Sequence, residues 1–133
     1  MSKIAINISL QQEHFEIDIS GNAAGFANLT DYLSRSPTGV FPLKSSPNTY
    51  FPMSIKILST KLVEQSKGLV TAQVSDAELR LMGDPKAFLK LGAFLESLQN
   101  LSPGEHFHLD WFSNEDLLAP NTSNMSFIFS IES

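Results

Sequence analysis

The sequence predicts an α+β protein in which an antiparallel sheet of about six to seven strands packs two helices on one face. Strand-like runs that alternate apolar and polar residues lie at 4–10, 15–19, 77–82, 106–111 and 125–131, and runs rich in Ile, Leu and Val lie at 54–62 and 68–74. Helical patterns interrupt them only twice, and each of these has apolar residues at three- and four-residue spacing. A parallel doubly wound sheet would need a helix between nearly all strands.

The first 35 residues predict a hairpin followed by a helix. Ile4, Ile6 and Ile8 alternate with polar or small residues, and Phe15, Ile17 and Ile19 do the same after a turn at 11–13. Asn22 is suited to cap a helix that runs to about Ser34, with its apolar face formed by Phe26, Leu29, Tyr32 and Leu33. Gly25 should weaken this helix by roughly 1 kcal/mol relative to alanine.

Residues 36–53 contain four prolines and are predicted to form a long irregular connection that packs over the domain. Strands at 54–62 and 68–74 should then be joined by a polar turn at 64–67, and a strand at 77–82 leads into the second helix. Asp84 is its expected cap and Pro85 its first residue, because the missing proline N–H is unpaired at that position in any helix. Pro103 and Gly104 end the helical region, and a polar loop at 113–124 precedes the closing strand.

An internal repeat joins these two helical units. Residues 16–33 and 78–95 align without a gap, with identical Glu16/Glu78, Gly21/Gly83, Phe26/Phe88, Leu29/Leu91 and Leu33/Leu95. The same similarity would arise if any strand, glycine, cap and helix unit followed the same rules of local structure. On both interpretations the chain holds two strand-to-helix units, and its 133 residues are expected to form a single domain, 1–133.

Composition excludes several classes of function. The chain has no cysteine, so disulfide frameworks, thiolate catalysis and cysteine-ligated zinc are excluded. There is no secretory signal pattern and no stretch of about 20 apolar residues, so we expect a cytoplasmic protein without a membrane span. Nucleophile elbows and glycine-rich nucleotide loops are absent, and the sequence implies no cofactor.

The strand at 106–111 carries the one constellation that could perform chemistry. Alternation places His106, His108 and Asp110 on one face, and Phe107, Leu109 and Trp111 on the other. Two histidines and a carboxylate can hold a divalent metal. The H-x-H-x-D string resembles part of the metallo-β-lactamase motif, but Trp111 replaces the next histidine and the chain is too short for that fold. Nothing in the sequence places His14, the third histidine, nearby.

Charge is distributed unevenly, with a net charge of −5. No Lys or Arg occurs from Leu91 to Ser133, whereas this part carries Glu96, Glu105, Asp110, Glu115, Asp116 and Glu132. It is therefore a poor nucleic-acid binder, because phosphate neutralisation supplies most nucleic-acid affinity. An acidic surface could steer a basic protein partner, and it could also serve solubility alone.

The order of a strand, Gly-Asp, a helix with F-x-x-L-x-x-x-L, then H-x-H-L-D and a closing strand resembles a family of small bacterial immunity proteins of polymorphic toxin systems. The residues that carry the resemblance are Gly83–Leu98, His106–Asp110 and Asn124–Ile131. It implies a non-catalytic protein that binds a cognate toxin in the cytoplasm and occludes it. The expected contact residues are His106, His108, Asp110, Glu115 and Asp116.

Two further hypotheses remain open on the sequence. The first is a metal-binding module or small metal-dependent enzyme that uses His106, His108 and Asp110. The second is a structural subunit that forms a homo-oligomer through an exposed sheet edge. The oligomeric state is therefore left between a monomer and a homodimer.

Overall fold

The computed structural model describes residues 2–35, 38–44 and 49–132. Its two helices are α1 (Ala23–Ser34) and α2 (Pro85–Ser97), with short 3-10 turns η1 (Leu98–Asn100) and η2 (Pro120–Thr122). The strands of this part of the chain are β1 (Ile4–Gln11), β2 (His14–Gly21), β3 (Gly39–Phe41), β4 (Met53–Ile55), β5 (Ile57–Leu62), β6 (Thr71–Ser75), β7 (Glu78–Gly83), β8 (His106–Asp110) and β9 (Met125–Ile131).

The α+β class and the packing of both helices against β-structure are confirmed. The predicted single antiparallel sheet of six to seven strands is instead two mixed sheets. One has five strands in the order β4-β1-β2-β9-β8, and the other has four in the order β3-β5-β7-β6. Two pairs are parallel, β2 with β9 and β5 with β7. The first pair joins strands from the two ends of the chain. The second pair places β7 between β5 and β6, which follow one another in the sequence.

The strand expected at 54–62 is divided between the two sheets. β4 pairs with β1, whereas β5 pairs with β3 and β7. The division falls at Lys56, where the backbone N–H groups of Lys56 and Ile57 both donate to the carbonyl of Ala77, at 2.7 and 3.1 Å. The connection predicted at 36–53 includes β3, which buries Phe41, while Tyr50 is exposed. Residues 36–37 and 45–48 of this connection lie outside the described residues.

Both predicted helix caps are confirmed. The Asn22 side chain accepts a hydrogen bond from the Gly25 backbone at 2.8 Å, and the Asp84 carboxylate accepts one from Ala87 at 2.8 Å. Asn22 also accepts from the Lys3 backbone N–H at 3.0 Å, which ties the start of α1 to the start of β1. Each helix thus begins at the residue that its cap specifies.

The internal repeat extends beyond the aligned residues to the whole topology. The first unit is β1-β2-α1-β3-β5 and the second is β6-β7-α2-β8-β9, with β4 added at the free edge of β1. In each unit an antiparallel hairpin precedes the helix, and an antiparallel pair follows it. Each hairpin pairs in parallel with the last strand of the other unit, so the two units are intertwined.

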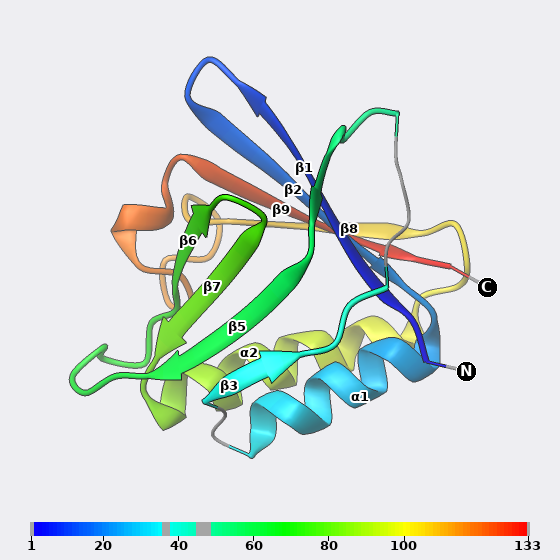
Figure 1. The fold of residues 1–133 in the computed structure, drawn as a ribbon. Coiled ribbons are helices and arrows are strands. Elements are labelled where there is room, and N and C mark those ends of the chain that lie inside the picture. The colour runs from blue at the N-terminus through cyan, green and yellow to red at the C-terminus, as the bar shows by residue number, and fades with distance from the viewer. Residues whose placement is uncertain (1, 36–37, 45–48, 133) are drawn as a thin grey trace.

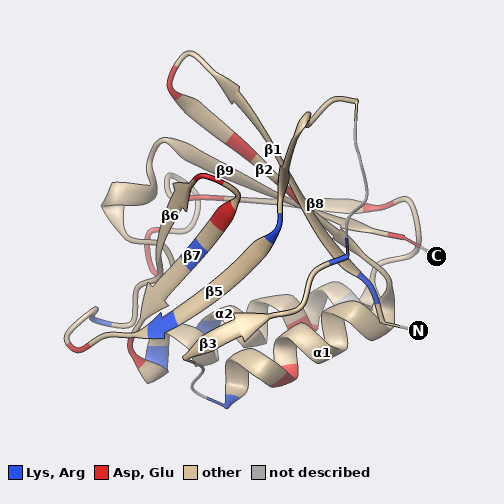
Figure 2. Cartoon of the chain, viewed as in Figure 1, with Lys and Arg blue, Asp and Glu red and all other residues tan. Residues whose placement is uncertain are grey.

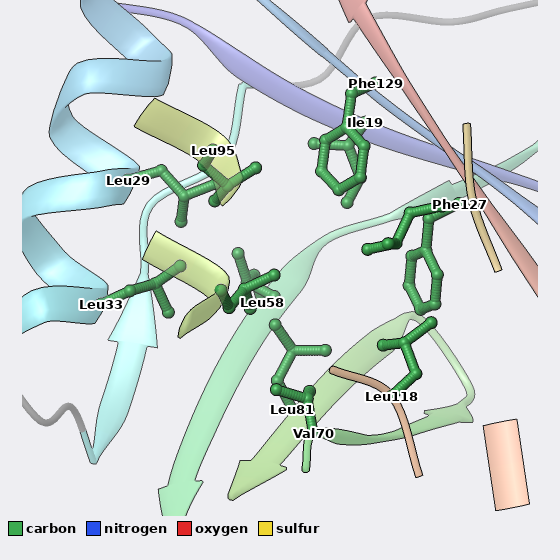
Figure 3. Close-up of a pocket in the computed structure, with 12 residues that line it drawn as sticks. Ile19, Leu29, Leu33, Leu58, Val70, Leu81, Leu95, Leu118, Phe127 and Phe129 are labelled. Carbon is green, nitrogen blue, oxygen red and sulfur yellow. The ribbon is translucent and has the colours of Figure 1, made fainter. Parts of the chain in front are cut away.

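The hydrophobic core lies between the two sheets and the two helices, which run side by side beneath them in Figure 1. Phe26, Leu29 and Leu33 face it from α1, and α2 contributes the equivalent set predicted from spacing. At its centre is a purely apolar cavity of about 30 Å³, bordered by residues of both sheets and both helices (Figure 3). This volume suits about one water molecule and is too small for a ligand site.

Candidate functional site

The outward side of the five-stranded sheet is polar. Its register aligns alternate side chains of all five strands, and we name this surface the polar face. Its residues are Asn7, Ser9, His14, Glu16, Asp18, Ser20, Ser54, His106, His108, Asp110, Ser126, Ile128 and Ser130. Most of the opposite side chains of the same strands enter the core, while Leu10, Met53 and Phe107 near the strand ends are exposed.

His106 and His108 lie on this face as the alternation predicts. Both side chains are exposed, and their rings meet edge to face with centroids 5.3 Å apart. Asp110 follows on the same side and is half-buried. Its carboxylate accepts a hydrogen bond from the Ser113 backbone at 2.9 Å, so it also fixes the turn that leaves β8.

Glu115 and Asp116 lie apart from the polar face, in the loop between β8 and β9. Both are exposed. The next two residues, Leu117 and Leu118, are buried, and the Val70 backbone bonds this loop at two points, Leu117 O and Ala119 N, at 2.8 and 2.9 Å. Within the described residues, Glu115 and Asp116 form no hydrogen bond or ion pair with His106, His108 or Asp110. They extend the acidic surface beyond the strand end.

Three ionisable residues of this face, His14, Glu16 and Asp18, were not among the predicted site residues. His14 Nε2 lies 2.9 Å from the Ser126 hydroxyl, because β2 pairs with β9. Asp18 is buried at the middle of the sheet and accepts a hydrogen bond from Ser130 Oγ at 2.9 Å. The alternation of His14, Glu16 and Asp18 in β2 was a signal for an outward polar row. The partner strand of that row was not readable from local sequence.

The environment of Asp18 favours its neutral form. Burial is the largest influence and raises the pKa of the carboxyl group above 3.8. The hydrogen bond from Ser130 opposes this rise, the negative charge of Glu132 adds to it, and the charge of His106 opposes it. Asp18 is therefore electrostatically linked to the histidine strand although β9 lies between them.

The geometry does not favour the metal-site hypothesis. Among the described residues, no group of three or more His, Cys, Asp or Glu side chains is placed to hold a metal ion. The two imidazoles of β8 face each other edge to face, and Asp110 is engaged by the turn at Ser113.

The two sheets differ in charge, as Figure 2 shows. The strands of the five-stranded sheet, with the β1–β2 turn and the segments that flank its strands, carry two cations, Lys3 and Lys56, against eight acids. These acids are Glu13, Glu16, Asp18, Glu105, Asp110, Glu115, Asp116 and Glu132. On the four-stranded sheet, Arg80 of β7 occupies the place equivalent to Asp18 and forms an ion pair with Glu78 at 3.2 Å.

The model of the Immunity protein 32 family matches residues 78–130. This segment is somewhat less than half of the chain and contains β7, α2, β8 and nearly all of β9, which is most of the second unit. The match supports an immunity protein family, as the resemblance implied, and does not test the H-x-H-L-D strand as its marker. No curated protein and no solved structure matches the chain. No helix of the described residues is long and apolar enough to cross a membrane.

Proposed function

We propose that this protein is an immunity protein that binds a cognate toxin in the cytoplasm and blocks it by occlusion, without catalysis. The observation that carries the proposal is the excess of acidic residues on the five-stranded sheet and its connecting loops, of which β8 and nearly all of β9 lie inside the segment that matches the immunity protein family. His106, His108 and Asp110 form the exposed end of its polar face. Glu115 and Asp116 extend the contact surface along the following loop.

The charge distribution supports a basic surface on the toxin. The acids of the sheet and its loops outnumber Lys3 and Lys56 even without Asp18, whose neutral form burial favours, and their negative potential steers a positively charged partner and raises its association rate. The exposed imidazoles and the short polar side chains around them add hydrogen-bonding groups without a deep pocket. Such a surface is suited to cover an active site and holds no catalytic constellation of its own.

The first experiment isolates the partner. The tagged protein is expressed in its native host, and a stoichiometric protein that co-purifies with it is identified, produced alone and tested for toxicity. Growth rescue on co-expression of the two proteins is the expected result. A co-purified protein without toxicity, or rescue that needs no complex, would contradict the proposal.

The surface is then tested with matched charge reversals. Glu115→Lys with Asp116→Lys should weaken the complex roughly ten-fold or more and reduce its salt dependence, because long-range attraction is lost. Glu64→Lys with Glu96→Lys makes the same change in net charge at exposed positions outside the polar face. Equal effects of the two pairs would show that net charge alone matters and would remove the loop from the contact surface.

The histidine face requires a second pair of variants. His106→Ala with His108→Ala should weaken the complex in graded steps, because each ring supplies only part of the contact. A single alanine at Gln73, exposed on the four-stranded sheet, serves as the control. Unchanged affinity of the double variant would place the toxin elsewhere on the molecule.

A further inference from the structure

β8 and β6 are the two five-residue edge strands of the described sheets, and β8 is the one whose outer side carries exposed residues at His106, Phe107 and His108. The other edge of the five-stranded sheet is β4, with three residues, and β3 at the edge of the second sheet is equally short. The fourth edge, β6, begins beside Val70, whose backbone is bonded by the loop at Leu117 and Ala119. A five-residue edge without cover is unusual, because its unpaired backbone groups invite another strand.

The backbone groups that β8 presents outward can be identified from its pairing with β9. Ile131 N donates to the carbonyl of Glu105 at 3.0 Å. Paired residues of an antiparallel ladder alternate between bonded and non-bonded positions, so Phe107 and Leu109 exchange hydrogen bonds with β9. The backbone N–H and C=O groups of His106, His108 and Asp110 therefore point away from β9, in the plane of the sheet and beyond its free edge.

We propose that β8 pairs antiparallel with β8 of a second copy of this chain, about a two-fold axis through His108. In this register, each residue whose backbone groups point beyond the edge lies opposite another such residue in the second strand. This is the condition for a hydrogen-bonded antiparallel ladder. His106 then lies opposite Asp110 of the second copy, and Phe107 lies opposite Leu109. A shift by two residues would lose one of the three bonded positions and would separate His106 from Asp110.

The side chains of β8 complement one another in this register. The imidazole of His106 meets the carboxylate of Asp110 at both ends of the ladder, and cross-strand pairs of this kind stabilise antiparallel sheets. Phe107 is 44% exposed at the edge although its ring packs edge to face on Phe94 of α2, with centroids 5.4 Å apart. Pairing would bury this remaining apolar surface.

The dimer is compatible with toxin binding and does not depend on it. Strand pairing uses the edge of the sheet, so the side chains of the polar face still point outward. The result is one continuous sheet that contains both copies of the five-stranded sheet. The exposed side chains of its polar face, His106 and His108, then lie beside the two-fold axis on both copies.

The first test measures the oligomeric state of the purified protein against concentration, by sedimentation velocity and light scattering. A reversible monomer–dimer equilibrium is expected. His108→Pro should weaken the dimer by about 100-fold, because both strands lose the N–H at the axis. His108→Ala keeps that N–H and should dimerise far better than the proline variant. Circular dichroism and melting show that each variant is folded.

A second test uses the absence of cysteine from the chain. In the proposed pair the Cα atoms of the two His108 residues lie about 5.5 Å apart, within the span of a disulfide, so His108→Cys should cross-link on mild oxidation. Val40→Cys is the matched control, since Val40 holds the equivalent place on β3 and is also exposed. A monomer at every concentration, a dimer unaffected by His108→Pro, or equal cross-linking of both cysteine variants would overturn the proposal.

Discussion

Gly25→Ala is expected to destabilise the fold, although alanine is the better helix former. A Cβ atom at this position of α1 would overlap the backbone of Lys3, which is the residue before β1. Lys3 cannot move aside freely, because its N–H donates to the Asn22 side chain at 3.0 Å and its carbonyl accepts from Asn22 N at 3.2 Å. The substitution therefore creates a steric clash between α1 and the residue that precedes β1.

The expected change in the free energy of unfolding is the sum of three contributions. Helix propensity favours alanine by about 1 kcal/mol. Overpacking against backbone costs about 1–3 kcal/mol, and the two Lys3–Asn22 hydrogen bonds contribute about 0.5–1.5 kcal/mol each if they break. The expected net loss is about 3 kcal/mol, which for a chain of this length lowers Tm by roughly 10 °C.

The matched control is Gly92→Ala on α2. A Cβ atom there would have its nearest contact at the Thr30 carbonyl oxygen, 3.7 Å away, which is ordinary van der Waals distance. Alanine should therefore stabilise the protein by about 0.5–1 kcal/mol. Urea unfolding followed by circular dichroism measures both changes. A neutral or stabilising Gly25→Ala, or the same sign for both variants, would refute the steric argument.

Three further changes test the electrostatics and the core. Asp18 has a raised pKa, so its ionisation costs stability as pH rises through the folded-state value, and Asp18→Asn should raise Tm at neutral pH and flatten that dependence. Asp84 has a lowered pKa, chiefly through the hydrogen bonds from Ala87 and Gly68, so its contribution is present above pH 3.8 and lost as pH falls through the folded-state value. Asp84→Asn should weaken that acid dependence in a pH series of thermal melts. Val70→Ile adds one methylene toward the central cavity and should stabilise by up to about 0.8 kcal/mol in urea unfolding; destabilisation would show that the cavity cannot receive it.

Local signals were sufficient for the elements that depend on neighbours in the sequence. The β1–β2 hairpin and both caps were predicted from alternation and from Gly21-Asn22 and Gly83-Asp84. The pairing of β2 with β9 was not predictable, because it joins segments more than 100 residues apart, and neither strand carries a mark of its partner. The break at Lys56 depends on the distant carbonyl of Ala77 and was missed for the same reason.

The candidate site also divides into features set by local sequence and features set by long-range strand pairing. Alternation alone predicted that His106, His108 and Asp110 share a face, since that follows from one strand. Their companions His14 and Asp18 come from β2 and reach the face only through β9. Leu117 and Leu118, which follow Glu115 and Asp116, are buried and hold the loop against the core beside Val70. Two leucines in a polar loop were the sequence feature that could have predicted this position.

The two units share one backbone topology, so the two sheets differ in the side chains that they present and not in the arrangement of their strands. Equivalent positions of the two sheets hold Asp18 and Arg80, and His108 and Val40. The same topology thus presents an acidic polar face on one side and a surface of mixed charge on the other. Each face combines strands of both units, but Asn7 and Ser9 of β1 and Asp18 and Ser20 of β2 are buried. The fully exposed side chains of the polar face, His106 and His108, lie on β8, inside the segment that the family match covers.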